Sequence, residues 1–291
     1  MSRYDVLYIF IIKSLEAIPY KGLFYIGKVL ALLLNTLPNK HKRISKANLE
    51  LVFPHKTSLQ INSILRDSLF HSIMNILEAG LVWGKQGYKK KPGFINIRNF
   101  SEIETALSSD KGVLLFTPHI GNIEIIINFL GQHTNCTVPY TQPKNKALDK
   151  VITNSRNKSG VKMVDTNISG IKEMLSALKN KKLVAVASDQ VPKKGAGIIS
   201  KFFNNEIYSM TLLPKLQQRT GCVAYLMYCE RKEKGEGFVI HFDRKIDLSS
   251  NIQEGVDKMN NEFEKCIMKL PGQYSWEYKK FKRTKLDSIY K

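Results

Sequence analysis

The chain has 291 residues, of which 43% are hydrophobic, and its 45 Lys and Arg against 25 Asp and Glu give a formal net charge of +20. This length and composition exclude a disordered or collagen-like chain and allow one large domain with a sizeable core. The excess positive charge indicates an anionic partner, and composition leaves open a nucleic acid, an anionic membrane, or an acidic protein or ligand.

Residues 4–37 form an apolar stretch that Pro19 and Gly22 divide in two. The second half contains Lys28 and is shorter than the roughly 20 apolar residues of a spanning helix. No small-residue cleavage site of a signal peptide follows. We therefore predict that residues 1–38 are a helical segment that lies on a membrane or marginally spans it; the alternative is two core helices of a soluble protein. The basic cluster directly after this segment suits an anionic cytoplasmic leaflet.

Residues 39–291 are predicted to form one α/β domain with a mainly parallel central sheet flanked by helices, because short apolar runs alternate with helical stretches. A helix with regular apolar periodicity covers residues 58–85 and ends at the lysines 89–91. The predicted strands are residues 94–97, 113–116, 137–140, 183–187, 223–227 and 238–242. The predicted helices lie near residues 101–108, 121–132, 146–157, 168–180, 208–219 and 252–269.

The four cysteines are too few, in a chain of this length, for a disulfide framework. They have neither CxxC spacing nor a histidine at a metal-finger distance, so no metal site is expected. We predict reduced, partly buried thiols on the cytosolic side of a membrane at Cys136, Cys222, Cys229 and Cys266.

The strongest candidate for chemistry is the segment that follows the predicted strand 113–116. His119 comes directly after this strand, Gly121 and Asn122 turn the chain, and an Ile-rich helix begins. Reactive groups collect at the carboxyl ends of strands in open α/β sheets, which is where a general base belongs. Five residues of a regular helix turn by about 500°, so the turn at Gly121 is needed to bring Glu124 to His119.

A carboxylate bonded to one imidazole nitrogen fixes the tautomer and makes the other nitrogen more basic. The free nitrogen can then deprotonate an alcohol supplied by a substrate. The alternative is that His119 is a capping or structural histidine. Rival motifs are absent from the sequence: it has no Gly-x-Ser-x-Gly elbow, Walker loop, Rossmann fingerprint or His-Glu-x-x-His. We therefore expect direct transfer between two bound substrates, without a cofactor.

Ordered segments surround the His119–Glu124 motif, from about residue 22 to residue 283. They are Leu37–Lys40, Asn48–Pro54, Glu78, Lys111–Gly112, Asn154–Arg156 with Gly160, Ser188–Gln190, Phe202–Phe203, Arg219–Gly221, Arg231, Glu264–Ile267, Pro271–Trp276 and Phe281–Arg283. Together they resemble the lauroyl and myristoyl acyltransferases of lipid A biosynthesis, within the wider lysophospholipid acyltransferase group. The motif itself is similar to the family's His-x4-Asp/Glu signature.

The resemblance implies a glycerolipid acyltransferase-like fold and transfer of a fatty acyl chain from a thioester carrier to a glycolipid hydroxyl. The carrier is usually acyl carrier protein, and the acceptor is a lipid A precursor of the Kdo2-lipid IVA type. His119 takes the hydroxyl proton, Glu124 orients and balances His119, and a positive group stabilises the oxyanion. Two alternatives remain. One is transfer to a lysophospholipid, ornithine lipid or other glycolipid, with acyl-CoA as a possible donor. The other is a catalytically silent basic protein that binds membranes or nucleic acid.

The resemblance also suggests substrate-binding residues. Arg156 is expected to be the cation of the pocket rather than a solvated helix residue. Asp189 and Gln190 follow the strand 183–187 at the edge where His119 lies, and they either hold the acceptor or cap a loop. Asn122 is expected to contact substrate. Ile123 stands where the family often has Trp, an apolar exchange that leaves the chemistry intact, whereas the segment after Asp189 departs from the enteric enzymes and leaves the exact acceptor open.

Phe202 and Phe203 are predicted to line an apolar wall, and Tyr274 and Trp276 to pack in the core or at a membrane interface.

The positive charge fits the partners that the resemblance implies, since acyl carrier protein, lipid A phosphates and the inner leaflet are all anionic. The candidate docking runs are residues 89–91, 193–194 and 279–283. No nucleic-acid-binding module matches the sequence, so we expect no nucleic acid partner. The expected location is the inner membrane, with the site facing the cytoplasm.

Overall fold

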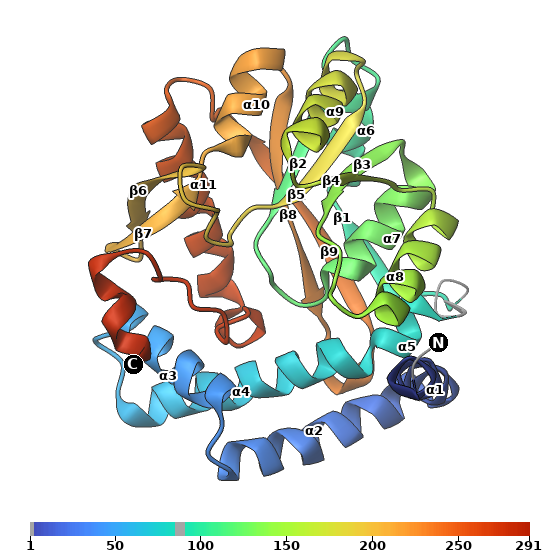
Figure 1. Ribbon diagram of the computed structural model, residues 1–291, viewed down its shortest axis with the longest axis vertical. Coiled ribbons are helices and arrows are strands. Elements are labelled where there is room, and N and C mark those ends of the chain that lie inside the picture. The colour runs from blue at the N-terminus through green and yellow to red at the C-terminus, as the bar shows by residue number, and fades with distance from the viewer. Residues whose placement is uncertain (1–2, 85–90) are drawn as a thin grey trace.

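A seven-stranded sheet forms the centre of the computed structural model, which describes residues 3–84 and 91–291 (Figure 1). All neighbouring strands are parallel except β8 and β9, so the predicted mainly parallel sheet is confirmed. In sheet order the strands are β1 (Ile95–Arg98), β9 (Phe238–Ile246), β8 (Val223–Arg231), β2 (Val113–Thr117), β5 (Leu183–Ala187), β3 (Cys136–Tyr140) and β4 (Lys162–Asp165).

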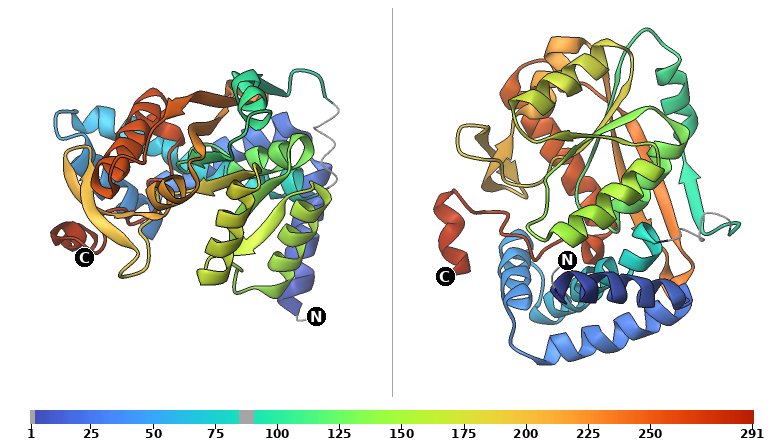
Figure 2. Two further views of the ribbon diagram at one scale, coloured as in Figure 1. Left: turned by 90° about the horizontal axis from the view of Figure 1, so that it is seen from above. Right: turned by 45° about the vertical axis from the view of Figure 1, so that its right-hand side comes forward.

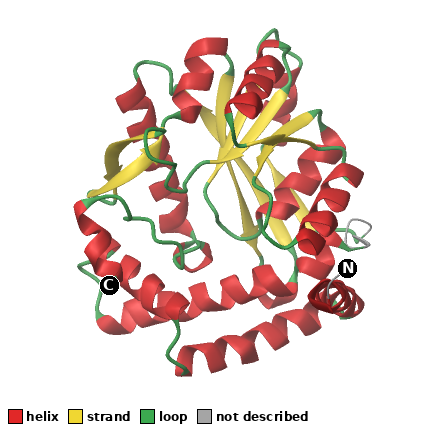
Figure 3. Cartoon of the chain, viewed as in Figure 1, coloured by secondary structure: helices red, strands yellow, loops and turns green. Residues whose placement is uncertain are grey.

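Each face of the sheet has its own core, because successive side chains of a strand point to opposite faces. On one face, β2 contributes Val113 and Leu115 to a core shared with α6 (Phe100–Leu107) and α7 (Ile123–His133). On the other, Leu114 and Phe116 pack against α9 (Ile168–Lys179), α10 (Leu212–Thr220) and α11 (Ile252–Lys269). Figure 3 shows the strands enclosed between these helices. Strands β2 and β5 are buried and apolar along almost their whole length, which is why the sequence predicted them, whereas the edge strand β4 is mostly exposed and was not predicted.

The N-terminal helices lie along one end of the sheet. α2 (Tyr20–Thr36) runs beside α4 (Ser58–Leu77), and α1 (Arg3–Ala17) contacts α5 (Ala79–Trp83) and α8 (Lys146–Lys158) (Figures 1 and 2). α3 (Lys40–Val52) connects α2 to α4. The periodic stretch 58–85 is thus two helices that meet at Glu78, and the lysines 89 and 90 lie outside the described residues.

No helix among the described residues is both long and apolar enough to cross a membrane alone. Residues Ile9–Ala17 and Tyr20–Thr36 reach the required length and hydropathy only as a pair, which is bent by 117°. α2 leaves a row of large apolar side chains exposed to solvent, among them Tyr25, Val29, Leu32 and Leu33.

The prediction that a helix covers residues 208–219 was wrong about where the helix begins. Its first residues end β7 (Asn205–Met210), which forms an antiparallel hairpin with β6 (Gly197–Phe202), and α10 begins only at Leu212. The hairpin turns through Phe203 and Asn204, both with positive φ. Two such residues make the tight turn that matches strand twist, but Phe is an unusual residue for it and therefore gave no turn signal. All four cysteines are free, as predicted, and they are fully rather than partly buried.

Candidate active site

His119 and Asp189 meet at the carboxyl edge of the sheet. β2 and β5 are parallel neighbours, so the residues that follow each strand emerge side by side. The His119 Nδ1 atom lies 2.5 Å from Asp189 Oδ1, and the His119 backbone N–H donates to Asp189 Oδ2 at 3.0 Å. An ionised carboxylate can only accept, so Nδ1 carries the hydrogen and Nε2 is left as the acceptor. Gln190 Nε2 is 3.4 Å from that Nε2 atom.

The charges around this pair favour an imidazole that binds a proton readily. Burial by itself lowers the pKa of His119, but the Asp189 carboxylate outweighs it and the net pKa is raised. Burial raises the pKa of Asp189, whereas His119 and Lys280 together lower it to about 2. Asp189 is therefore ionised at neutral pH.

Glu124 does not have the partner that the sequence suggested. Its carboxylate pairs with Arg156, with Arg156 Nη2 donating to Oε1 at 2.5 Å and Nε to Oε2 at 3.3 Å. The carboxylate bonded to the His119 ring is that of Asp189. The physical reason lies in the sheet: the parallel pairing of β2 with β5 brings a residue 70 positions away closer to the ring than one five positions away. Arg156 is buried, with its guanidinium 4.9 Å from the centre of the Tyr140 ring, so it is not a solvated helix residue.

Asn122 also differs from the expectation of a substrate contact. It is the N-cap of α7, and its side-chain oxygen accepts from the Glu124 N–H at 3.0 Å. Its amide nitrogen donates to Glu78 Oε2 at 2.8 Å. Both ends of this buried side chain are thus bonded within the protein.

The loop that carries His119 passes close to the backbone of β8. Gly121 has a φ of +60°, and a Cβ there would lie 2.0 Å from the carbonyl oxygen of Cys229. Glycine is needed at this position both for the left-handed backbone and for the close approach. The C-terminal segment holds the loop from the other side, because Gly121 N–H donates to the Gln273 carbonyl and Ser275 N–H to that of His119.

A mostly apolar cavity of about 730 Å³ opens beside His119. Ile123, Ile127 and Leu130 of α7 line it at helical spacing, and Arg156 and Gln190 supply polar groups. The cavity extends where β3 and β5 separate, since these strands pair only through Cys136–Leu183 and Thr137–Val184. Side chains from both faces of the sheet therefore reach it. A concave apolar site with a few converging polar groups is typical of a small-molecule or lipid site.

Lys280 belongs to this site, although sequence reasoning assigned it to a docking surface. It is 3% exposed, its ammonium donates to the Asp189 carbonyl oxygen, and it lies 4.8 Å from the centre of the Phe202 ring. Burial lowers the pKa of Lys280 to about 8, although Asp189 acts to raise it. Lys280 lies in a run of basic residues, and nothing in the sequence of that run indicated that its side chain is buried. Lys193 and Lys194 are exposed, as a docking surface requires.

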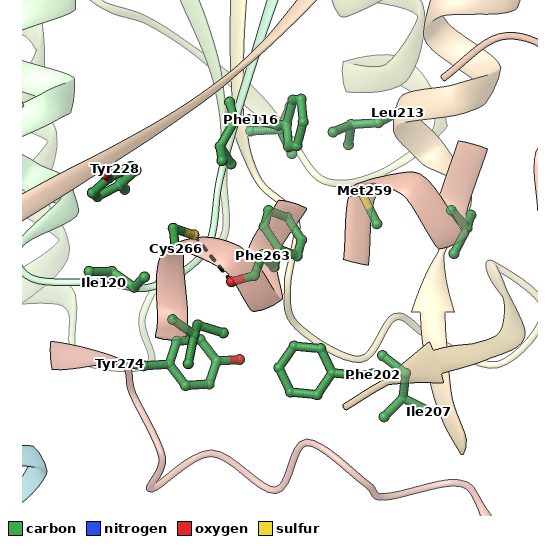
Figure 4. Packing of buried hydrophobic residues seen from close by; sticks show 14 of the residues in the cluster. Phe116, Ile120, Phe202, Ile207, Leu213, Tyr228, Met259, Phe263, Cys266 and Tyr274 are labelled. Carbon is green, nitrogen blue, oxygen red and sulfur yellow. Dashed lines mark hydrogen bonds between the residues drawn. The ribbon is translucent and has the colours of Figure 1, made fainter. Parts of the chain in front are cut away.

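The aromatic residues near the site are core residues. Phe202, Tyr274 and Trp276 are buried, whereas Phe203 is only half-buried and packs edge-on against Phe53. Figure 4 shows Tyr274 and Phe202 among the apolar side chains of α11 and β7. Among the described residues, no group of three or more His, Cys, Asp or Glu is placed to hold a metal ion.

Comparison with known proteins assigns the chain to a family. The sequence model of the bacterial lipid A biosynthesis acyltransferase family matches residues 1–283. The chain belongs to this family of acyltransferases. It is 21% identical to the lipid A biosynthesis palmitoleoyltransferase of Escherichia coli K12 over 91% of this chain and 86% of that protein. The chain is 25% identical to a lipid A biosynthesis acyltransferase of Haemophilus influenzae, over 93% of this chain and 87% of that protein. It is 23% identical to the lipid A biosynthesis lauroyltransferase of E. coli K12, over 91% of this chain and 87% of that protein.

Proposed function

We propose that this acyltransferase moves a fatty acyl chain from a carrier thioester to a hydroxyl of a lipid A precursor, at the cytoplasmic face of the inner membrane. The observation that carries the proposal is an imidazole whose Nε2 atom is left as a proton acceptor, at an apolar cavity large enough for an alkyl chain. Membership of the lipid A acyltransferase family supports the acceptor class.

His119 acts as the general base. Its Nε2 atom takes the proton of the acceptor hydroxyl while the hydroxyl oxygen bonds to the thioester carbonyl carbon. The tetrahedral intermediate then breaks the carbon–sulfur bond, and the imidazolium returns the proton to the leaving thiolate. Asp189 stabilises the imidazolium and holds the ring through Nδ1. No covalent acyl-enzyme is required.

Arg156 supplies positive charge to the oxyanion. Its guanidinium lines the cavity and is held in place by the Glu124 carboxylate and the Tyr140 ring. In this reading the carboxylate of the His-x4-Glu motif acts on catalysis through Arg156. The Gln190 amide nitrogen lies 3.4 Å from His119 Nε2, so Gln190 is placed to contact the acceptor.

The donor is proposed to be acyl carrier protein, with acyl-CoA as the alternative. The net charge of +20 favours an acidic protein carrier, and Lys193 lies at the cavity beside His119. The relatives named for lauroyl and palmitoleoyl transfer support a long-chain acyl group.

The membrane contact is proposed to be residues 1–38, and in particular the exposed apolar side of α2. A row of large exposed apolar side chains on one helix is typical of an interaction site, such as a membrane contact. Lys28 and the basic start of α3 lie beside it and suit anionic headgroups.

Two experiments test the function. Mass spectrometry of lipid A from cells with and without the gene should show the loss of one secondary acyl chain. Purified wild-type protein should transfer an acyl group from acyl carrier protein to a lipid A precursor, and His119→Ala should not. Unchanged lipid A with an altered phospholipid or aminolipid would show that the acceptor lies outside lipid A.

A further inference from the structure

A buried polar cluster lies directly behind the His119 loop (residues 118–122), separate from the residues that line the cavity. Its centre is the ion pair of Glu78 and Arg231, whose side chains are both 0% exposed. Arg231 Nε donates to Glu78 Oε1 and Nη2 donates to Oε2, each at 2.7 Å. An ion pair taken out of water often adds little stability over apolar residues of similar size, so its other contacts indicate what it is for.

The Glu78 carboxylate also holds the start of α7. Its Oε2 atom accepts from the Asn122 amide, whose oxygen in turn accepts from the Glu124 N–H. These two hydrogen bonds fix the amide orientation of Asn122. They also connect the ion pair to the helical turn that presents Glu124 to Arg156.

The same carboxylate joins two N-terminal helices to the loop. Tyr20, the first residue of α2, donates its hydroxyl to Glu78 Oε1 at 2.8 Å. Arg231 Nη2 also donates to Asn75 of α4, and Nη1 lies 2.6 Å from His71 Nδ1 of the same helix. Glu78 itself lies at the junction of α4 and α5, so one side chain receives donors from α2, β8 and the His119 loop.

We propose that Glu78 is a positioning residue for acyl transfer: its contact with Asn122 holds the His119 loop and the first turn of α7 in the reactive geometry. The inference rests on the proposed function. Catalytic groups are sensitive to such placement, since a shift of about 1 Å can cost about a hundredfold in rate. Glu78 does not act on the substrate directly.

A swap of the two polar groups tests the contact. Asn122→Asp keeps the cap, because a carboxylate accepts from the Glu124 N–H, but it places a second carboxylate against Glu78. We expect kcat to fall by at least about tenfold. Adding Glu78→Gln restores a donor–acceptor pair between positions 78 and 122 and leaves one carboxylate in the cluster. The new amide nitrogen at position 78 also faces Arg231 Nη2, which donates to Glu78 Oε2, so we expect the double variant to recover part of the lost kcat.

The pH profile gives a second readout that a simple loss of stability would not produce. Two adjacent carboxylates raise the pKa of one of them, so the ratio of the Asn122→Asp kcat to the wild-type kcat at the same pH should rise as the pH falls and the pair shares a proton. The double variant, which has one carboxylate, should not show this rise.

Glu78→Met with Asn75→Asp is the matched control. It returns a negative charge to Arg231, which bonds Asn75 at 2.7 Å, but leaves the Asn122 amide without an acceptor at position 78. We expect this variant to regain thermal stability without regaining kcat. Equal kcat in the two double variants would overturn the proposal, and so would Asn122→Asp with wild-type kcat. If the wild type itself transfers no acyl group, it is the proposed function that has failed.

Discussion

At the scale of single residues, His119 is surrounded by charges that act on its pKa in opposite directions. Asp189 and Glu277 raise the pKa, and Lys280 lowers it. One carboxylate oxygen of Glu277 is buried without a hydrogen-bond partner among the described residues. The base form of His119 exists only above its raised pKa. The acid limb of the pH profile should therefore have its midpoint above the ordinary histidine value of about 6.5.

Asp189→Asn should lower kcat/KM by about a hundredfold to ten-thousandfold, because the amide no longer fixes the reactive tautomer or balances the imidazolium. The residual activity should have its acid limb at lower pH, since burial alone lowers the pKa of His119. The pH dependence of kcat/KM measures both effects. Asp110→Asn is the control, because Asp110 is an exposed residue paired with the exposed Lys181. An unshifted limb in Asp189→Asn would contradict the assignment of Asp189.

Lys280→Met should move the acid limb in the opposite direction, to higher pH. Removal of the ammonium leaves burial as the cause that opposes Asp189 and Glu277, so the pKa of His119 rises. The same kcat/KM profile measures the shift. Lys279→Met is the neighbouring control and should leave the limb where it is. A downward shift in Lys280→Met would show that the buried ammonium acts on some other group.

At the scale of elements, the site depends on how α2, α7 and β8 are fastened to one another. The His119 loop has Gly121 against the backbone of β8 on one side and Asn122 against Glu78 on the other. Tyr20 connects α2 to the same carboxylate. The N-terminal helices are therefore part of the support of the site as well as the proposed membrane contact.

Tyr20→Phe removes only the hydroxyl that α2 donates to Glu78. We expect the free energy of unfolding to fall by about 1–3 kcal/mol, because a hydrogen bond to a buried charged group is lost. Denaturant unfolding of the full chain measures the change. Tyr25→Phe on the exposed side of the same helix should change it by less than about 0.5 kcal/mol. Equal effects of the two variants would mean that the Tyr20 hydroxyl does not hold α2.

At the scale of the whole molecule, α2 carries the exposed apolar row. This helix lies at the end of the sheet opposite α9 and α10 (Figure 1). The positive charge and this row together favour an orientation with α2 on the membrane.

Val29→Gln with Leu33→Gln should weaken binding to phosphatidylglycerol vesicles by at least about tenfold, since two large apolar side chains no longer enter the lipid. Vesicle cosedimentation measures the loss. Ile168→Gln, an exposed apolar residue at the start of α9, should bind like the wild type. Wild-type binding by the double variant would place the membrane contact elsewhere.

The sequence by itself determined the α/β class, most strands, the helices α8, α9 and α11, and His119 as the candidate base. These features are local: a buried strand is apolar along its length, a helix repeats its apolar positions, and His119 directly follows a strand. The hairpin of β6 and β7 was not predicted, because Phe203 is an unusual residue for a tight turn and the local sequence therefore did not indicate one.

The tertiary structure decided which side chains meet. Parallel pairing of β2 with β5 places Asp189 on His119, and Glu124 is left to Arg156. Burial of Lys280 could not be read from a basic run. Contacts of this kind depend on strand order and on chain segments tens of residues apart, which periodicity and spacing do not record.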